Sequence, residues 1–202
     1  MRVSVVGDPA SPARVLVVGA VHGTETAGRA VAGALRRRPP NLPGVALWIV
    51  RDLNPDGSAA GTRQNARGVD LNRNFPDAWR PEGRPFDTFH AGARALSEPE
   101  SRMLARLVGR LRPDLTIWYH QALALVDLGT ARRPALPRTY ARASGLPVAR
   151  LGFLPGIATR WQNRAHGGSA FVVELPGGAL TAAAAARHAR AVVVTARTAA
   201  RG

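Results

Sequence analysis

The sequence has 202 residues, of which 46% are hydrophobic, so it is long enough for one sizeable core and predicts a single domain over residues 1–202. No apolar run reaches the ~18 residues that a membrane span needs, and the first apolar stretch is too short for a signal peptide, so we expect a cytoplasmic protein. Because cysteine is absent, disulfides and thiolate ligands are excluded, and histidines and carboxylates would have to bind any metal ion.

All 28 basic residues are arginines, and the formal net charge is +15. One interpretation of this charge is nucleic-acid binding. The arginines are spread along the chain, however, and group only at residues 36–38 and 131–133, and the few aromatic residues do not alternate with them. We therefore favour a bias in composition and expect neither a nucleic-acid nor a membrane partner, although a positive field would attract an acidic substrate.

Short runs rich in β-branched residues predict strands over residues 3–6, 14–20, 45–50, 115–120 and 170–175. Apolar residues at helical spacing predict helices over residues 26–38, 97–111, 134–145 and 181–199. Ser97 and Thr181 are the candidate N-caps of two of these helices. His188 lies among arginines in the last helix, so we expect it at the surface. Alternating strands and helices predict an α/β sheet with helices on both faces.

Two stretches follow neither pattern. Residues 51–96 are rich in Gly, Pro, Asn and Arg, and residues 151–169 form a second irregular stretch. Loops of the first length are uncommon in compact domains and usually carry function or are disordered. We therefore expect a site built on loops, with the second stretch as another wall or a lid.

The sequence "HGTE" follows the second predicted strand and has two interpretations. In the structural one, Gly23 allows a sharp turn, Thr24 caps the next helix, and Glu25 favours its first turn. In the other, His22 and Glu25 are two metal ligands close in sequence, to which zinc enzymes commonly add a distant third. His120 ends a predicted strand and suits that role. The pair alone leaves both interpretations open.

Further candidates for a hydrolytic site lie beyond this pair. Glu174 is a carboxylate late in an apolar strand, where it would either take a proton from water or form an ion pair with one of the arginines. In "GVDLNRNFP", Arg73 can hold a carboxylate with two hydrogen bonds and Asn72 can donate another. Arg63 could stabilise a developing oxyanion. Each loop arginine could equally be solvated.

Taken in order, "HGTE", "NPDG", "TRQNARGVDLNRNFP", a histidine at a strand end and "VELP" resemble the M14 family of zinc carboxypeptidases. The resemblance runs from residue 18 to residue 178. It is closest to the murein peptide amidase branch, which cleaves γ-D-glutamyl-diaminopimelate bonds in cell-wall peptides. This implies one Zn²⁺ per chain, held by His22, Glu25 and His120.

The same resemblance implies roles for the other candidates. Asn72 and Arg73 would hold the free carboxylate of a small peptide substrate, Arg63 would polarise the scissile carbonyl, and Glu174 would be the catalytic base. The implied fold is a three-layer α/β/α sandwich around a mixed sheet of roughly eight strands. Because the chain is short for the family, we expect some peripheral elements to be missing.

The sequence departs from the digestive members of the family in the loop before the catalytic glutamate. Those members carry a tyrosine there, whereas residues 151–169 contain none. Trp161 and Gln162 occupy that loop and are predicted to take part in substrate binding. Asp127 could pair with a substrate ammonium group, but we favour an ion pair with a neighbouring arginine.

Two other functions compete with the peptidase. The N-acyl-amino-acid deacylases related to succinylglutamate desuccinylase and aspartoacylase share the ligand pattern, but the "NPDG" turn, the long "GVDLNRNFP" motif and "ELP" favour a peptidase. A metal-free basic binding protein is the other alternative, and its affinity would fall steeply with salt and ignore chelators.

Overall fold

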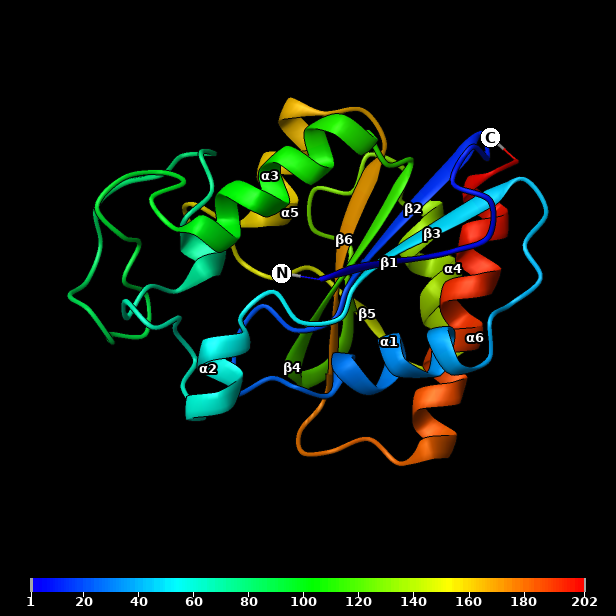
Figure 1. The fold of residues 1–202 in the computed structure, drawn as a ribbon, viewed down its shortest axis with the longest axis horizontal. Coiled ribbons are helices and arrows are strands. Elements are labelled where there is room, and N and C mark those ends of the chain that lie inside the picture. The colour runs from blue at the N-terminus through cyan, green and yellow to red at the C-terminus, as the bar shows by residue number, and fades with distance from the viewer. Residues whose placement is uncertain (1, 202) are drawn as a thin grey trace.

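In the computed structural model, which describes residues 2–201, strands and helices alternate along the chain (Figure 1). The strands are β1 (Val3–Val6), β2 (Ala13–Val18), β3 (Val45–Val50), β4 (Leu115–Asp127), β5 (Val148–Ala149) and β6 (Ser169–Pro176). The helices are α1 (Gly28–Arg37), α2 (Pro55–Ala60), the 3-10 helix η1 (Leu71–Arg73), α3 (Pro99–Leu111), α4 (Ala135–Ser144), α5 (Ala158–Ala165) and α6 (Ala182–Ala199). Every predicted element is present, with ends shifted by at most two residues except that β4 continues to Asp127.

The strands form one mixed sheet in the order β1-β3-β2-β4-β5, with β6 paired to β4. β2 runs parallel to both β3 and β4, β4 is paired in parallel with β6, and β1 is antiparallel to β3 at the edge. The α/β class is confirmed. The described residues form six strands rather than about eight, and the long loop over residues 51–96 folds into only α2 and η1.

The sheet is covered on both faces, which explains why its central strands are apolar without interruption. Alternate side chains of β2 enter different cores: Val15 and Val17 pack with residues of α1, α4 and α6, whereas Leu16 and Val18 pack with residues of α3 and α5. Figure 1 shows these two groups of helices on opposite sides of the sheet. The predicted three-layer α/β/α arrangement is confirmed.

β4 borders β6 twice. Up to Ala122 its register partners advance along β6, and His120 lies opposite Glu174. After the irregularity that follows, Leu125 is matched with Glu174 and Asp127 with Val172, so the partners now descend along β6. Ala124 at the bend has a φ of 52°. The end of β4 therefore runs back beside β6, which places Asp127 next to the same strand that carries Glu174.

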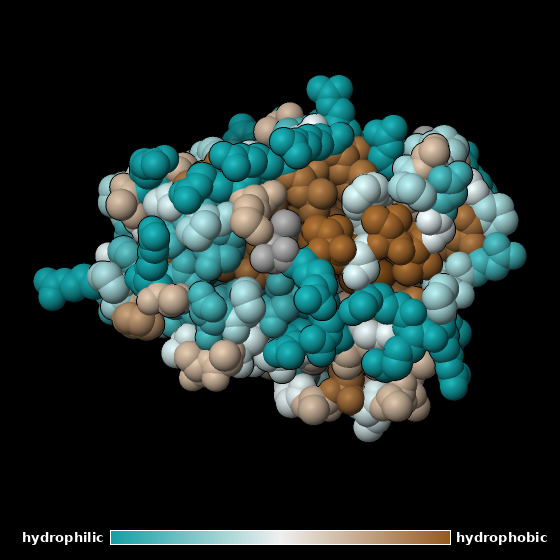
Figure 2. Space-filling view, viewed as in Figure 1, coloured by the Kyte–Doolittle hydropathy of each residue, from teal (hydrophilic) through white to brown (hydrophobic). Residues whose placement is uncertain are grey.

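On the face drawn in Figure 2, hydrophilic side chains surround an apolar patch that lies between α3 and the edge strand β1. Val5 of β1 is 39% exposed. Over the described residues, no helix combines the length and the apolar character that crossing a membrane requires.

Several local predictions are settled by hydrogen bonds. Thr181 caps α6 by accepting from the backbone N–H of Ala184 at 3.2 Å, as predicted. Ser97 does not cap α3, because the cap position falls on Glu98 and the Ser97 hydroxyl donates to the Glu98 side chain. Thr24 does not cap α1, which begins only at Gly28. The second irregular stretch was expected to be loop throughout, but residues 158–165 form α5.

His188 is buried rather than exposed, so the surface prediction for it is wrong. Its Nδ1 shares a hydrogen bond of 2.9 Å with the Tyr140 hydroxyl, which in turn shares one of 2.8 Å with the Tyr119 hydroxyl. These three residues connect α6 and α4 to β4. The sequence suggested a solvated position because arginines flank His188. It did not reveal the burial, because the tyrosine partners lie far away in sequence. Burial, with the charge of Arg187 adding to it, lowers the pKa of His188 to about 4.

We predict that His188 makes the fold less stable as the pH falls. Below its ordinary value of 6.5 the unfolded chain gains a proton that the folded chain takes up only near pH 4. The stability contributed by neutral His188 is therefore complete above about pH 6.5 and declines by about 2–3 kcal/mol on the way down to about pH 4. His188→Gln should flatten the pH dependence of the free energy of unfolding in urea over this range. Identical slopes for both proteins would contradict this.

Candidate active site

His22 and Glu25 lie in the turn that leaves β2, and His120 lies in the neighbouring strand β4. β2 and β4 are parallel and are matched at Val18 and Trp118, so the segments that follow these residues meet at the same edge of the sheet. Gly23 is required within the turn, because a Cβ there would lie 2.0 Å from the carbonyl carbon of Gly57. The glycine thus lets the turn pack against α2, and the turn brings two side chains next to His120 of β4.

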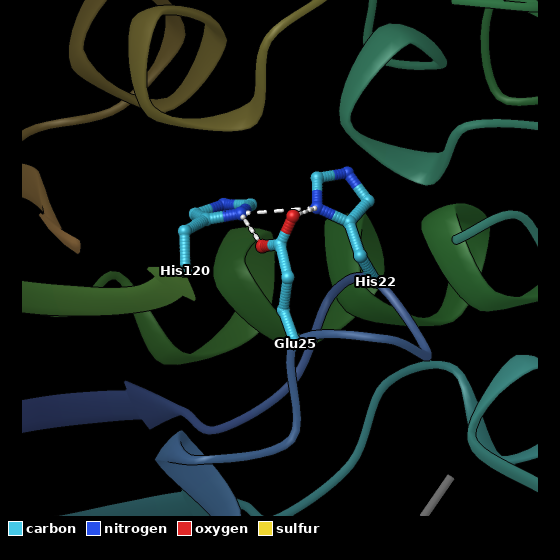
Figure 3. A group of neighbouring side chains, drawn as sticks. All are labelled: His22, Glu25 and His120. Carbon is cyan, nitrogen blue, oxygen red and sulfur yellow. Dashed lines mark hydrogen bonds and ion pairs between the residues drawn. The ribbon is translucent and has the colours of Figure 1, made fainter. Parts of the chain in front are cut away.

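The three side chains converge on one point (Figure 3). The Nδ1 atoms of His22 and His120 are 3.2 Å apart, and each is 2.9 Å from a different oxygen of Glu25. Zinc at its usual distance of about 2.0–2.1 Å from nitrogen holds neighbouring ligands in a tetrahedron about 3.3 Å apart. The donor set and its spacing therefore fit Zn²⁺, and the three residues predicted as metal ligands are brought together.

The charges of this group are set by buried contacts. Burial alone would raise the pKa of Glu25, but hydrogen bonds with His120 and His22 hold it well below its usual range, so Glu25 is a carboxylate. Burial opposes a charge on His22, but the adjacent Asp70 and Glu25 raise its pKa. Glu25 Oε2 also accepts from the backbone N–H of Gln121 at 3.2 Å.

Asp70 is the residue behind His22, and sequence reasoning missed it. It is fully buried, and its Oδ1 accepts from His22 Nε2 at 2.8 Å and from the Asn72 backbone N–H at 2.9 Å. Burial works against ionisation, but His22 and Arg63 hold the pKa of Asp70 well below its usual range. A carboxylate bonded to the far nitrogen of a histidine leaves the near nitrogen free to bind a metal. The signal was the aspartate inside "GVDLNRNFP".

Arg63 is brought to the site, where it contacts two carboxylates. Its Nη1 donates to Glu25 Oε1 at 2.7 Å, and its Nε and Nη2 both lie 3.1 Å from Asp70 Oδ2. A guanidinium group has five N–H donors, so two remain beyond these three contacts. The side chain is 27% exposed and faces the cleft described below.

Arg73 carries a buried charge that lacks an anionic partner among the described residues. The residue is 4% exposed, its Nη1 donates to the Asn72 carbonyl oxygen at 2.8 Å, and its Nε has no hydrogen-bond partner. Burial lowers its pKa, and the ring of Phe89 lies 4.7 Å from its Cζ. Asn72 Oδ1 accepts from the backbone N–H of Ala158 at 3.0 Å, which fixes the side chain next to Arg73.

Glu174 lies on β6 opposite His120 and is 9% exposed. The sequence left open an ion pair with an arginine, but none of the described arginines lies within ion-pairing distance of it, and its Oε2 is buried without a hydrogen-bond partner. Burial raises its pKa. A carboxyl group of this kind exchanges a proton more readily near neutral pH than an ordinary glutamate does.

These residues line a single cleft of about 160 Å³ at the edge of the sheet. All three candidate ligand side chains line it, together with Arg63, Arg73 and Glu174. Asp127 of β4 and Val172 of β6 line it as well. The remaining lining residues come largely from the segment before α5 and from α5 itself, namely Leu151, Gly152, Leu154, Ile157 and Thr159. The second irregular stretch thus forms a wall, as expected.

Trp161 and Gln162 do not line this cleft. Trp161 packs on Phe75 with 5.1 Å between ring centroids. Gln162 is buried against the sheet, where its Oε1 accepts from Trp118 Nε1 at 3.2 Å and its Nε2 donates to Thr116 Oγ1 at 2.6 Å. The structure therefore does not bring these two residues to the cleft, because α5 turns both side chains toward the core.

Comparison with known proteins agrees with this geometry. The zinc carboxypeptidase family model matches residues 41–140. Murein peptide amidase A of Escherichia coli strain K12 is 33% identical over 160 residues, which are 72% of this chain and 64% of that protein, so the match spans a little under two thirds of the relative's length.

Solved structures point the same way. Murein-tripeptide amidase MpaA from Escherichia coli O157 superposes with a TM-score of 0.73 and 27% identity over 93% of this chain and 84% of that chain. Carboxypeptidase A from Helicoverpa armigera, at 18% identity, shares the fold with a TM-score of 0.78 over 96% of this chain and 62% of that one. By sequence match, fold and ligand geometry together, this chain belongs to the zinc carboxypeptidase family.

Proposed function

We propose that this chain is a zinc-dependent peptidase of carboxypeptidase type, which hydrolyses a peptide or amide bond beside a residue with a free carboxylate. The observation that carries the proposal is the cleft itself. One space of about 160 Å³ is lined by three side chains that together could bind zinc. It is also lined by a buried glutamate and a buried arginine, neither of which has a partner of opposite charge among the described residues. Each of these is costly to the fold by itself, and together they suit amide hydrolysis.

His22, Glu25 and His120 would hold the zinc ion, with Asp70 fixing the orientation of His22. When bound, Zn²⁺ lowers the pKa of a water molecule and polarises a carbonyl group. Glu174 takes the proton from the attacking water and passes it to the nitrogen of the leaving amine. The raised pKa of Glu174 suits this double role, because a carboxyl group with a higher pKa can both accept and release a proton more readily near neutral pH.

Arg73 binds the free carboxylate and so determines which bond reaches the reacting position, with the Asn72 amide beside it. Arg63 stabilises the developing oxyanion through the N–H groups that Glu25 and Asp70 leave free. This arrangement separates positioning, by Arg73, from charge stabilisation, by Arg63.

The proposed substrate is a small peptide derived from murein. It rests on the names of the relatives, whose length this chain only partly spans. The proposal places the reaction in the cytoplasm. A panel of a murein tripeptide, hippuryl amino acids and N-succinylglutamate distinguishes this activity from a deacylase, which would cleave the last compound alone.

We expect one zinc ion per chain. His22→Ala should lose most of it, because the variant keeps only two of the three ligands. Elemental analysis after dialysis measures this, and His90→Ala, which changes a loop histidine outside the cleft, should keep the wild-type content. Stoichiometric zinc in His22→Ala would mean that the metal binds elsewhere.

Glu174→Gln should retain zinc and lose most turnover. The amide keeps the shape of the side chain but cannot accept the proton, and general-base contributions are of the order of 10²–10⁴ in kcat. Glu100→Gln, on α3 outside the cleft, is the matched control and should turn over normally. Wild-type kcat in Glu174→Gln is incompatible with the role given to Glu174, and loss of zinc would make it a ligand.

Arg73→Lys should cost about 2–3 kcal/mol in kcat/KM, or about 30- to 150-fold, because an ammonium group cannot replace a planar guanidinium that holds both carboxylate oxygens. The wild type should strongly prefer a substrate with a free carboxylate over its amide, and the variant should lose most of that preference. Arg67→Lys, at an exposed position in the same loop, is the control. Equal acid-to-amide ratios in wild type and Arg73→Lys would reject a carboxylate-binding role.

A further inference from the structure

A second cavity, of about 620 Å³, lies between the start of β1, the end of β3, α1 and α2, and it shares no lining residue with the cleft of the candidate active site. Arg2, Arg29, Arg36 and Arg51 line it, and Asp52 is the one acid among the described residues that do so. Four positive charges therefore meet one negative charge, which leaves a formal excess of +3 around this space.

The edge of the sheet brings two of these arginines together. β1 is antiparallel to β3, and Val3 is matched with Val50. The next residue outward on each strand is an arginine, so Arg2 and Arg51 follow this matched pair at neighbouring strand ends. Like charges opposite each other on neighbouring strands are destabilising. Neither guanidinium has an acidic partner among the described residues, so nothing in that part of the chain offsets this repulsion.

Helix α1 contributes a second pair of arginines. Arg29 and Arg36 are seven residues apart, which places them on the same face of the helix, about 10 Å from each other along its axis. Arg29 Nη1 lies 3.5 Å from Asp52 Oδ2, while Asp52 Oδ1 accepts from the backbone N–H of Asn54 at 3.0 Å. Asp52 therefore balances the charge of one arginine, and Arg36 has no acidic partner among the described residues.

The wall of this cavity also holds an unused hydrogen-bond donor. Ser58 of α2 lines the cavity, and its Oγ is buried without a hydrogen-bond partner among the described residues. A serine hydroxyl can donate one hydrogen bond, and leaving that bond unmade in a buried place is unfavourable. Ser4 of β1 adds another hydroxyl group to the lining. Guanidinium and hydroxyl groups together are the donors that bind phosphate oxygens.

We propose that this cavity binds an anion with two linked phosphate groups, that is, a diphosphate. One phosphate group lies at the strand ends between Arg2 and Arg51, and the other lies against α1, because a guanidinium holds two oxygens of one phosphate group in a planar fork. The volume of about 620 Å³ is within the range of small-ligand sites and leaves room for more than one phosphate group. The inference goes beyond the proposed peptidase activity and does not depend on it, because the two sites share no residue.

The test is titration calorimetry of the zinc-loaded protein with inorganic diphosphate at about 0.15 M salt, where weak pairing of exposed charges is largely screened. The wild type should bind one diphosphate per chain and should bind inorganic phosphate about 10-fold or more weakly. The double variant Arg36→Gln and Arg51→Gln should lose about 100-fold in affinity, because each change removes charged hydrogen bonds. Arg67→Gln with Arg110→Gln removes the same charge at exposed positions outside the cavity and should bind like the wild type.

Further arms locate the bound anion and identify its source. Ser58→Ala should weaken binding about 3- to 10-fold and leave the Tm of the free protein unchanged, because this hydroxyl has no partner to lose. Protein freed of zinc by a chelator should bind diphosphate as well as the zinc-loaded protein does. Adenosine diphosphate that binds more tightly than inorganic diphosphate would identify a diphosphate ester as the ligand, and weaker binding would identify the free anion.

Four results would overturn the inference. They are no binding by the wild type, an undiminished affinity in the double variant, an equal loss in the control variant, and a loss of binding when zinc is removed. Tighter binding of an oligothymidylate through Arg36 and Arg51, with an affinity that falls steeply with salt, would also overturn it by making nucleic acid the ligand.

Discussion

The fully buried carboxylate of Asp70 accepts hydrogen bonds from a candidate zinc ligand, from the guanidinium of Arg63 and from the backbone at the start of η1. Each contact orients a different part of the site. The bond to His22 fixes its ring, the bond to Arg63 holds that side chain beside Glu25, and the bond to the backbone starts the turn that presents Asn72 and Arg73. An unpaired carboxylate in this position would be costly, so the stability of the loop and the geometry of the site depend on the same contacts.

The charged residues of the cleft fall into two groups. Arg63 is neutralised by Glu25 and Asp70, and these paired groups surround the candidate metal position. Arg73, Glu174 and Asp127 have no opposite charge within ion-pairing distance among the described residues. The first group fixes the shape of the site. The residues of the second group line the cleft and carry polar atoms without a hydrogen-bond partner among the described residues, and such atoms gain most from meeting a substrate or a proton.

The sequence predicted those parts of the site that local patterns specify. The strand before "HGTE" and the strand that ends near His120 were apolar runs, and parallel strands bring the segments that follow to one edge. Trp161 and Gln162 lie outside the cleft because helix formation over residues 158–165 decides which way those side chains face, and the sequence did not predict that helix. His188 was misplaced and Asp70 overlooked for a related reason, since the partners that make each of them necessary lie 48 residues away.

Because β6 pairs with two separate parts of β4, the site can be assembled only in one order. The three candidate zinc ligands lie on β4 and in the turn between β2 and α1, both of which precede residue 128 in the chain. Glu174 arrives on β6, which fits between the outgoing and the returning parts of β4. Long-range strand pairing of this kind forms slowly compared with local structure. A ribosome-bound chain therefore presents the three candidate ligands well before Glu174, and the candidate site is complete only when β6 has entered the sheet.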